Sequence, residues 1–306
     1  MTEMRGGFKM DVIGIDLGGT TIHAGIVNGE GILKDKVCIP TPTQEGREGI
    51  EAALVSIIEA FKRRSDEIGA VGIGSAGRID SYTGRVLFAT DHLPGWTGTN
   101  VKAMLENMSG LPAFVENDVN AAALGEGWQG AARDLTHYVM FTIGTGVGGA
   151  LVHDGKLING PTGSGGEFGH IVLYPDGERC NCGQRGCVEQ YVSGSALTRR
   201  AQRIDPEWDS YRLIEQAAAG HTEAIQHITL FVRRLAMGLV TVYNVYDPEG
   251  IILGGGVSTS YPIWKQRLAT EIRRFTPHHI HIVPGELGDD AGIIGAAYLA
   301  LKHTRH

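Results

Sequence analysis

The stretch VIGIDLGGTTIHAGIVNGEGIL, Val12–Leu33, has the pattern of a β-hairpin: an apolar strand, a glycine-threonine turn, and a second strand that ends in a polar turn with glycine. The expected strands are Val12–Asp16 and Thr21–Val27, and a third strand ends near Pro40. The connections are too short for a crossover helix, so these three strands form an antiparallel meander.

The same pattern returns at mid-chain as VMFTIGTGVGGALVHDGKLI, Val139–Ile158. An apolar strand, a glycine-threonine turn, a second strand and a short polar turn follow one another in the same order. Any two β-hairpins share some of these features, but the matching order favours an internal duplication. We therefore expect an α/β protein with two lobes, each of which begins with a glycine-rich β-turn-β unit.

Helical and strand patterns alternate along the rest of the chain. Helices are expected at 48–64, 119–127, 262–275 and 291–302, with a mainly helical region at 196–246. Short buried strands are expected at 71–73, 113–116 and 251–253. No proline- or serine-rich linker divides the chain. The predicted lobes are residues 1–118, completed by the C-terminal helix at 291–306, and residues 119–290.

Composition narrows the possible functions. The 306 residues carry a formal net charge of −7 and only short basic clusters, which argues against a nucleic-acid-binding surface. Residues 1–9 have no apolar core and do not read as a signal peptide, and we expect no apolar run long enough to span a bilayer. Four cysteines are too few for a disulfide scaffold. These features predict a cytoplasmic protein with no membrane partner.

The 45 glycines gather in short loops, several of them directly after an apolar run. Gly144–Gly149 contains a GxGxxG string, but a dinucleotide-binding turn leads from a strand into a helix, and here a strand follows. The Rossmann interpretation is therefore disfavoured. What remains is a hairpin in which the Thr145 hydroxyl and backbone N–H groups such as that of Gly146 could hold phosphate oxygens.

The first hairpin offers a similar phosphate site in the sequence DLGGTT, where Asp16 ends the strand and Gly18, Gly19, Thr20 and Thr21 follow. An aspartate would repel a phosphate unless a cation lay between them, and Mg²⁺ prefers carboxylate, water and phosphate ligands. Asp16 could instead only cap the turn. The neighbouring glycine loop favours the magnesium role.

One loop holds three of the four cysteines together with a histidine. His170, Cys180, Cys182 and Cys187 supply one nitrogen and three thiolates, which suits a closed zinc site. The C-x-C spacing is too tight for a disulfide between its own members, and no C-x-x-C redox pair is present. A full ligand set leaves no position for a reactive water, so we expect a structural Zn²⁺. Cys38, far away in a predicted strand, is expected to be an ordinary buried residue.

These motifs together resemble the ROK family (repressors, open reading frames, kinases) and, within it, the bacterial glucokinases. The most discriminating part is the zinc signature, EFGH at Glu167–His170 with CNCGQRGCVE at Cys180–Glu189. DLGGTT, IGTGVGG and ENDVNAA at Glu116–Ala122 fit the same family. The likeness runs from about residue 11 to residue 300.

The resemblance implies a fold and a cofactor. The fold is the two-lobed, actin-like ATPase (ribonuclease H-like) architecture with a cleft between its lobes, which sugar kinases share with actin and Hsp70-type chaperones. In that fold the glycine patch Gly254, Gly255 and Gly256 would suit the adenosine side of ATP.

The resemblance also implies roles for the acids. In ROK sugar kinases an Asn-Asp pair binds the sugar, with the aspartate as catalytic base. The pair follows the strand that corresponds to residues 113–116 here, so it matches Asn117 and Asp118. The family's E-x-G-H motif and the acid after the last cysteine also reach the sugar, which matches Glu167, His170 and Glu189. His170 would then bind zinc through one ring nitrogen and a sugar hydroxyl through the other. Capping of the following helix is the alternative for Asn117-Asp118, and the two roles can coexist.

The chain departs from the family's pattern in one loop. Many members carry Pro-Gly where this chain reads GSAGRID, Gly74–Asp80. That loop touches the sugar in relatives, so Gly77 is an expected sugar contact. The segment Asp91–Trp96 occupies a region where sugar kinases set substrate choice. We expect any unusual selectivity to come from His92 or from Ser75–Gly77.

The expected activity is ATP- and Mg²⁺-dependent phosphorylation of the 6-hydroxyl of a hexose, with glucose as first candidate. Mannose, fructose, N-acetylhexosamines and β-glucosides remain alternatives within the family. A sugar-responsive repressor is disfavoured, because the first strand begins by residue 12 without room for a DNA-binding helix-turn-helix. An ATP-using chaperone module is disfavoured, because it would not need so many sugar-type hydrogen-bonding groups. The resemblance further implies a homodimer or tetramer.

Overall fold

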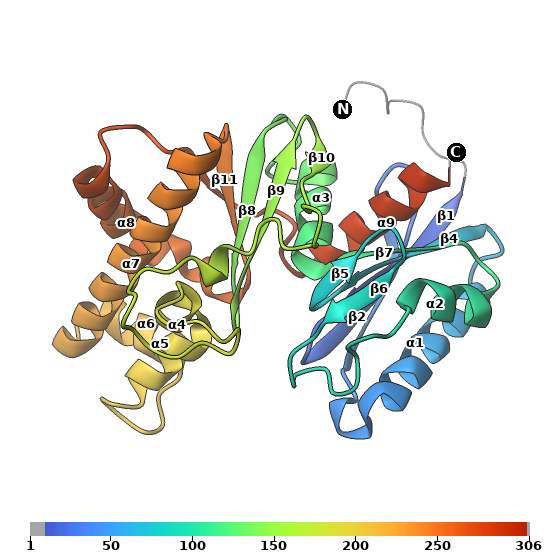
Figure 1. Cartoon of the computed structure of the whole chain (residues 1–306), viewed down its shortest axis with the longest axis horizontal. Helices are drawn as coiled ribbons and strands as arrows, with labels where there is room; N and C mark the ends of the chain where they lie inside the picture. The colour runs from blue at the N-terminus through green and yellow to red at the C-terminus, as the bar shows by residue number, and fades with distance from the viewer. Residues whose placement is uncertain (1–9, 305–306) are drawn as a thin grey trace. The chain divides into compact units, whose positions relative to one another are not determined.

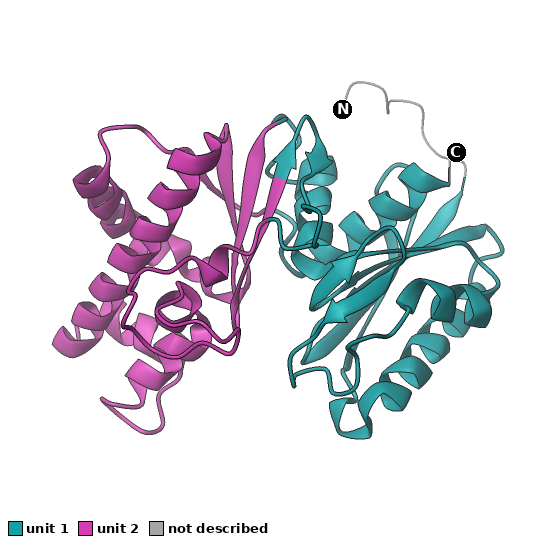
Figure 2. Cartoon of the chain, viewed as in Figure 1, with its two compact units in different colours: residues 1–136, 152–165, 286–306 teal, residues 137–151, 166–285 magenta. Residues whose placement is uncertain are grey.

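A computed structural model describes residues 10–304 of the chain (Figure 1). The chain divides into two compact units (Figure 2). Among the described residues, unit 1 consists of residues 10–136, 152–165 and 286–304. Unit 2 consists of residues 137–151 and 166–285. The prediction that residues 1–9 are not a signal peptide lies outside the described residues.

Two five-stranded sheets have the same strand order (Figure 1). The first sheet runs β3 (Leu33–Pro40), β2 (Thr21–Val27), β1 (Asp11–Leu17), β4 (Ile68–Ser75) and β7 (Ala113–Asn117). The second runs β10 (Lys156–Leu157), β9 (Val147–His153), β8 (Tyr138–Ile143), β11 (Gly250–Gly254) and β12 (Ile282–Pro284). In each sheet the first strand of the meander pairs in parallel with the fourth strand. The predicted duplication is confirmed.

Helices complete each unit. Those of unit 1 are α1 (Gly46–Lys62), α2 (Val101–Ser109), α3 (Asp118–Gln129) and α9 (Ala291–His303). Those of unit 2 are α4 (Glu189–Val192), α5 (Gly194–Ala201), α6 (Ser210–Ala218), α7 (Thr222–Tyr246) and α8 (Tyr261–Phe275). Short 3-10 turns are η1 (Thr43–Glu45), η2 (Phe168–His170), η3 (Gly256–Ser260) and η4 (Gly288–Asp290). The predicted helices are present with ends shifted by a few residues, and the helical region divides into α5, α6 and α7.

Helix α9 lies directly on strands β1 and β4. A Cβ atom at Gly14 would come within 2.1 Å of the Ile293 carbonyl oxygen, and one at Gly72 within 1.8 Å of that of Ala296. Only glycine leaves room for the helix backbone at these two strand positions. On the other side of the sheet, residues such as Ile13 pack with α1 in a second cluster of buried side chains.

Helix α3 packs closely against α9, which places the division of the chain later than predicted. A Cβ atom at Gly295 of α9 would lie 1.6 Å from the Ala121 carbonyl oxygen of α3, so the two backbones touch. Leu157, from the β10 segment, joins Leu124 and Tyr298 in a small apolar cluster. The predicted boundary at residue 118 therefore differs from the compact units, in which α3 and residues 152–165 belong to unit 1.

We expected no apolar run long enough to span a bilayer. This was wrong, because helix α7 is long and apolar enough to do so when only its length and composition are considered. Helix α7 has 25 residues and a mean hydropathy of 1.3 over its most apolar 18-residue window. Half of that window is buried inside the protein. The ring of Phe231 meets Trp264 of α8 edge-on at 5.4 Å within the core of unit 2. The core of unit 2 accounts for the apolar character of α7.

Three further differences from the sequence expectations concern unit 1. Cys38 lies on β3 as expected but is exposed, because β3 is the edge strand of its sheet. A hairpin of β5 (Arg78–Asp80) and β6 (Arg85–Phe88) follows β4 and was not predicted. Helix α2 was also missed, although the Asn100 side chain caps it by accepting from the Ala103 N–H at 3.0 Å.

Candidate functional site

Asn117 and Asp118 lie where strand β7 ends and helix α3 begins. Oδ1 of Asn117 caps the helix by accepting from the backbone N–H groups of Val119 and Asn120, at 3.0 and 3.1 Å. Nδ2 of Asn117 donates to Oδ1 of Asp118 at 2.8 Å and to the Gly77 carbonyl at 2.9 Å. The capping alternative is therefore confirmed. The same side chain also brings the predicted residues Gly77 and Asp118 together.

The Asp118 carboxylate is held in a fixed orientation. Its Oδ1 accepts a second hydrogen bond, from the Val119 N–H at 2.9 Å. The residue is the first of α3, where the helix dipole favours a negative charge. An oriented carboxylate at a helix N-terminus is suited to accept a proton from a hydroxyl group placed beside it.

Asp16 lies beside Asp118 in unit 1 and carries a strongly perturbed carboxyl group. Burial, followed by the charges of Asp118 and Asp289, raises the pKa of Asp16 to about 8. A Cβ atom at Gly292 would lie 2.5 Å from Cγ of Asp16, so the first turn of α9 packs on this carboxyl group. A divalent cation would relieve the repulsion between these acids, and carboxylates are the ligands that Mg²⁺ prefers. The residues present fit a magnesium ion.

The turn between β1 and β2 is held by an internal hydrogen bond and by contacts with two other segments. The Gly18 N–H donates to the Thr21 carbonyl at 3.0 Å, and the Thr41 hydroxyl donates to the Gly18 carbonyl at 2.7 Å. A Cβ atom at Gly19 would lie 2.9 Å from Cβ of His92. His92, which we expected to influence sugar selectivity, therefore lies against the glycine turn. The predicted phosphate turn is therefore contacted by two other segments, one at Thr41 and one at His92.

The other loop expected to affect selectivity is tied to the core. The Ser75 side chain is fully buried and accepts a hydrogen bond from Nε1 of Trp96 at 3.0 Å. Gly77 has φ of +107°, and a Cβ atom there would lie 2.6 Å from the Phe88 carbonyl oxygen. Ser75 therefore links the loop to the Asp91–Trp96 segment. The positive φ of residue 77 and its close contact with Phe88 leave room only for glycine there.

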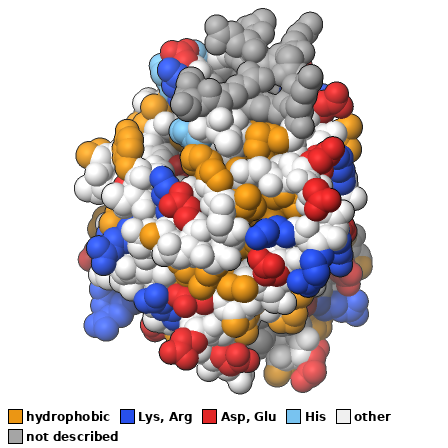
Figure 3. Space-filling view, turned by 90° about the vertical axis from the view of Figure 1, so that its right-hand side faces the viewer, with side chains coloured by type: hydrophobic (Ala, Val, Ile, Leu, Met, Phe, Trp, Pro, Cys, Tyr) orange, Lys and Arg blue, Asp and Glu red, His pale blue; other side chains and the backbone are white. Residues whose placement is uncertain are grey.

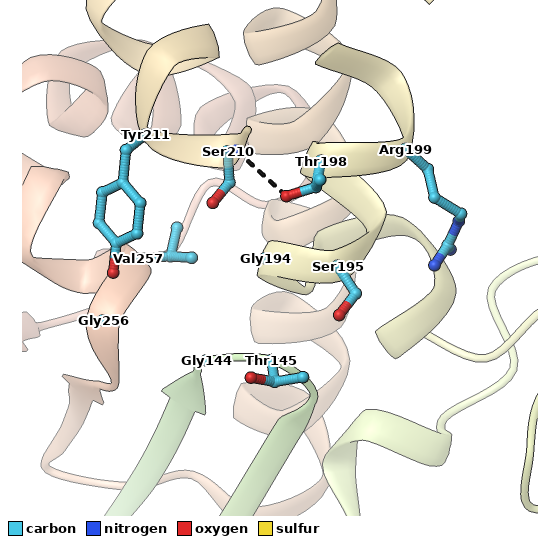
Figure 4. A pocket seen from close by; sticks show the side chains of 10 residues that line it. All are labelled: Gly144, Thr145, Gly194, Ser195, Thr198, Arg199, Ser210, Tyr211, Gly256 and Val257. Atoms are coloured by element: carbon cyan, nitrogen blue, oxygen red, sulfur yellow. Dashed lines mark hydrogen bonds between the residues drawn. The ribbon is translucent and has the colours of Figure 1, made fainter. Parts of the chain in front are cut away.

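Unit 2 contains a pocket of about 470 Å³ (Figure 4). Its lining residues come from four segments: Gly144 and Thr145, then Gly194, Ser195, Thr198 and Arg199, then Ser210 and Tyr211, and finally Gly256 and Val257. The first and last segments are the ones in which we predicted phosphate and adenosine contacts. The structure therefore brings together two predicted segments that lie more than a hundred residues apart in the sequence.

Helix α5, along most of its length, and the start of helix α6 also line the pocket, which was not predicted. The Gly194 N–H donates to the Gly144 carbonyl at 2.7 Å, which joins α5 to the glycine hairpin. The Thr198 hydroxyl accepts from the Ser210 N–H at 3.1 Å, the bond drawn in Figure 4, and this joins α5 to α6. The signal for α5 was present: Ser193 before Gly194 caps the helix by accepting from the Ala196 N–H.

The three glycines predicted to contact adenosine, Gly254, Gly255 and Gly256, have different roles in the structure. Gly256 lines the pocket, and a Cβ atom there would lie 2.7 Å from the Tyr211 hydroxyl. Gly255 has φ of +82° and lies against the Ile143 backbone, so it shapes the turn after β11. Gly254 is buried at the end of that strand. The pocket lining includes only Gly256 of these three glycines.

The four predicted zinc ligands come together in unit 2. One ring nitrogen of His170 and the Sγ atoms of Cys180, Cys182 and Cys187 all lie within 4.8 Å of one another. Sγ of Cys180 lies 3.7 Å from Nδ1 of His170, and Sγ of Cys182 lies 3.7 Å from Sγ of Cys187. Two thiolates on a tetrahedral zinc, each at about 2.3 Å, are about 3.8 Å apart. The ligand set and its spacing fit Zn²⁺.

The loop around these ligands depends on two glycines. Gly183 and Gly186 have φ of +93° and +71°. A Cβ atom at Gly186 would lie 1.6 Å from the Tyr174 carbonyl oxygen. Burial, together with the neighbouring Cys182 thiol, raises the pKa of the Cys187 thiol to about 12. A metal ion supplies the positive charge that thiolates need in such an environment.

The two ring nitrogens of His170 face different groups. Nδ1 faces the cysteines, whereas Nε2 lies 3.9 Å from Oε2 of Glu167. The predicted sugar ligands Glu167 and His170 are thus neighbours. The nitrogen turned away from the metal site is the one available to a ligand on the Glu167 side.

Glu189 connects the segment that carries the candidate zinc ligands (residues 170–187, here the zinc loop) to the Gly144–Gly149 hairpin within unit 2. Its Oε2 accepts from the Val147 N–H at 3.0 Å, and its Oε1 lies 3.9 Å from Sγ of Cys180. A Cβ atom at Gly146 would lie 2.5 Å from Oε2 of Glu189. Glu189 therefore has structural contacts on both sides, which the sequence did not indicate.

The model of the ROK family matches residues 12–303 of this chain. The chain belongs to the ROK family. Its fold is the two-domain, actin-like ATPase fold of ROK sugar kinases, as predicted.

Individual ROK proteins cover almost the whole chain. Glucokinase of Thermotoga maritima is 34% identical to it, over 94% of this chain and 96% of that protein. N-acetylmannosamine kinase of Escherichia coli is 32% identical, over 95% of this chain and 98% of that protein. The solved structure of a ROK family glucokinase from Streptomyces griseus, in complex with glucose and AMPPNP, is 35% identical with a TM-score of 0.85. It covers 95% of this chain and 99% of its own.

Proposed function

We propose that this ROK protein is a sugar kinase that transfers the γ-phosphoryl group of ATP to the 6-hydroxyl of glucose. The observation that carries the proposal is the Asp118 carboxylate, which Asn117 and the Val119 N–H hold at the start of α3 with Asp16 beside it. Phosphoryl transfer needs an acceptor base, charge neutralisation and positioning. The similarity to glucokinases over most of the chain supports the same activity.

In this proposal Asp118 accepts the proton of the sugar hydroxyl as that oxygen attacks the γ-phosphorus. The bond from the sugar oxygen to phosphorus forms, and the bond from phosphorus to the bridging oxygen of ADP breaks. Asp16 would hold Mg²⁺, directly or through water, which neutralises phosphate charge when bound. Asn117 positions Asp118 through its amide group.

The nucleotide contacts are assigned to both glycine hairpins and to the unit 2 pocket. The turn after Asp16 and the turn at Thr145 and Gly146 present backbone N–H groups that suit phosphate oxygens. The pocket next to Thr145 has the volume and the mixed lining expected of a nucleoside site. We assign it to the adenosine of ATP.

The sugar contacts are assigned to Gly77, Asn117 and Asp118 of unit 1 and to Glu167, His170 and Glu189 of unit 2. Carboxylates, amides and imidazoles suit the many hydroxyl groups of a hexose because each can accept or donate a hydrogen bond. A structural Zn²⁺ at His170, Cys180, Cys182 and Cys187 would keep Glu189 and His170 in place. These roles follow the ROK motifs residue by residue.

We further infer a cytoplasmic enzyme that acts as a homodimer or tetramer and binds no nucleic acid or membrane. On the face seen in Figure 3, Lys and Arg side chains are interspersed with Asp and Glu and form no single basic patch. The negative net charge agrees with this inference.

N-acetylmannosamine is the second candidate substrate, because a kinase of that sugar is 32% identical over 95% of the chain. A coupled assay of ADP release decides between the sugars. We expect glucose to give the highest kcat/KM in a panel with mannose, fructose, N-acetylglucosamine, N-acetylmannosamine and a β-glucoside. A preference of about tenfold or more for N-acetylmannosamine, equal to about 1.4 kcal/mol, would replace glucose by the alternative. ADP release that no sugar stimulates would refute the kinase proposal.

A further inference from the structure

A buried carboxylate lies directly before the Asn117-Asp118 pair. The Glu116 residue is only 3% exposed, at the end of strand β7. Burial raises the pKa of its carboxyl group, and hydrogen bonds from neighbouring residues oppose that shift. The roles proposed above give Glu116 no part in sugar or nucleotide binding. An acid retained in such a place needs partners that satisfy it.

The partners of Glu116 are all N–H donors. Oε1 accepts from the backbone N–H of Asn117 at 2.9 Å and from Nδ2 of Asn120 at 3.0 Å. Oε2 accepts from Nδ2 of Asn159 at 2.8 Å. Asn120 Nδ2 also lies 3.3 Å from Oδ1 of Asn159, so the three side chains form a closed network. Its hydrogen-bond directions require an acceptor at 116 and a donor at 159.

Asn159 extends the network to the β5 segment of unit 1. Its Nδ2 also donates to Oγ of Ser81, at 3.1 Å, just beyond strand β5. In the loop that follows Asn159, Oγ of Ser164 accepts from Nη1 of Arg78 at 3.3 Å. Gly163 lies so close to the Ile79 carbonyl oxygen that a Cβ atom would come within 2.6 Å. The loop after β10 is therefore fastened to the β5 segment, which begins directly after Gly77.

The network thus joins three segments of unit 1 at the end of β7, directly before Asp118. Glu116 bonds the backbone of Asn117, which in turn holds Asp118 and Gly77. Asn159 attaches the neighbouring loop to the same carboxylate. Each bond lies within unit 1 and close to one end of β7. A shift of this carboxylate would move Asn117, and with it the carboxylate of Asp118.

We propose that Glu116 and Asn159 form a positioning pair that fixes the orientation of the Asn117-Asp118 pair for phosphoryl transfer. The inference rests on the proposed kinase function. It adds two residues that do not touch substrate, and it explains the first and fifth positions of the sequence ENDVN, where Glu116 and Asn120 stand. Small displacements of a reacting group can cost about a hundredfold in rate.

The test exchanges the two groups of the pair. Glu116→Gln places an amide N–H₂ opposite the Asn159 amide, and Asn159→Asp places two carboxylates together. The double variant Glu116→Gln/Asn159→Asp restores one amide and one carboxylate with their positions exchanged. We expect each single variant to lower kcat by about tenfold or more, with the KM for ATP unchanged. The double variant should recover to within about threefold of the wild type.

Two further variants separate positioning from stability. Glu271→Gln removes a carboxylate that is 6% exposed in unit 2, where it pairs with Arg274, and it should lower the unfolding midpoint without lowering kcat. Asn159→Ala removes the donor without adding a charge, so it remains informative if a single charge-altering variant fails to fold. We expect folded Asn159→Ala protein to lose about tenfold in kcat.

The outcomes distinguish this inference from the kinase proposal. Wild-type kcat in folded Glu116→Gln or Asn159→Ala protein, or losses that simply add in the double variant, would overturn the positioning pair. If the wild-type protein phosphorylated no sugar, the kinase proposal would fail. The thermal unfolding midpoints of the wild type, Glu116→Gln, Asn159→Asp and the double variant would then still measure the coupling between residues 116 and 159. If the midpoint shifts of the two single variants simply added in the double variant, the pair itself would be overturned.

Discussion

The carboxylate of Glu189 accepts a hydrogen bond from the backbone N–H of Val147 at 3.0 Å. One oxygen of this side chain thus holds the glycine hairpin of unit 2, and the other lies 3.9 Å from the Cys180 thiol of the zinc loop. A residue assigned to the sugar therefore also joins the loop assigned to zinc with the hairpin assigned to phosphate. A substitution that displaces Glu189 in one of these loops should therefore also change ligand binding at the other.

Gly146→Val tests this connection. A Cβ atom at Gly146 would lie 2.5 Å from Oε2 of Glu189, so the new side chain must displace the carboxylate as well as fill space beside the hairpin. We expect both ATP and glucose to bind at least about tenfold more weakly, which is about 1.4 kcal/mol each. Isothermal titration calorimetry with AMPPNP and with glucose measures both affinities.

Gly144→Ala is the matched control in the same hairpin. Its added Cβ atom meets no atom within 4 Å of the protein, and Gly144 lines the unit 2 pocket. We expect this variant to change nucleotide affinity only. Unaltered glucose affinity in Gly146→Val protein would show that Glu189 does not couple the two loops.

Cys182→Ala should remove the proposed zinc. A closed site of one histidine and three cysteines holds one Zn²⁺ per chain, and the loss of a thiolate leaves an incomplete cage. We expect zinc content to fall from about one per chain to near zero and the KM for glucose to rise, while AMPPNP binding is better preserved. Elemental analysis and steady-state kinetics give the two readouts.

Cys38→Ala is the control for the loss of a thiol, because Cys38 is exposed on β3 of unit 1. It should keep both zinc and activity. An active wild-type enzyme that contains no zinc, or a zinc-free Cys182→Ala enzyme with unchanged glucose kinetics, would eliminate the structural-zinc proposal.

Asp16→Asn should alter how magnesium and pH affect stability. The folded-state pKa of Asp16 is raised from 3.8 to about 8, so the folded protein binds this proton more tightly than the unfolded chain. The stability that the proton contributes is complete below about pH 4 and is lost as the pH rises toward about 8. Without Mg²⁺, the wild-type unfolding midpoint should fall more steeply over this range than that of Asp16→Asn.

Addition of millimolar MgCl₂ together with AMPPNP at about pH 8 should raise the wild-type midpoint more than that of Asp16→Asn. Differential scanning fluorimetry measures both effects. Equal pH profiles for the two proteins, or equal responses to Mg²⁺ with AMPPNP, would remove Asp16 from the magnesium site.

Local patterns in the sequence were sufficient for the meander and its repeat. Val12–Val27 and Val139–Ile158 show strand and turn signals that depend on neighbouring residues, and the antiparallel strands that open each sheet follow from them. The cluster of candidate zinc ligands was predicted for a similar reason, because His170 and the three cysteines lie in one short stretch of the sequence. The capping of α3 by Asn117 follows the same local rules.

Contacts between distant segments were not accessible in this way. The close packing of α3 on α9 joins Ala121 to Gly295, and no local pattern reports such a pair. The α5 and α6 contribution to the pocket has the same origin, since Gly194 reaches Gly144 through the tertiary fold. The exposure of Cys38 follows from the edge position of β3, which depends on the strand order.

The rate of glucose-dependent ADP release by Asp118→Asn tests the central claim most directly. The substitution preserves the size of the side chain and removes the proposed base, whose carboxylate Asn117 holds at 2.8 Å. We expect a folded protein that still binds glucose and AMPPNP but turns over at least about a hundredfold more slowly than the wild type. Near-normal turnover by a folded Asp118→Asn protein would contradict the account.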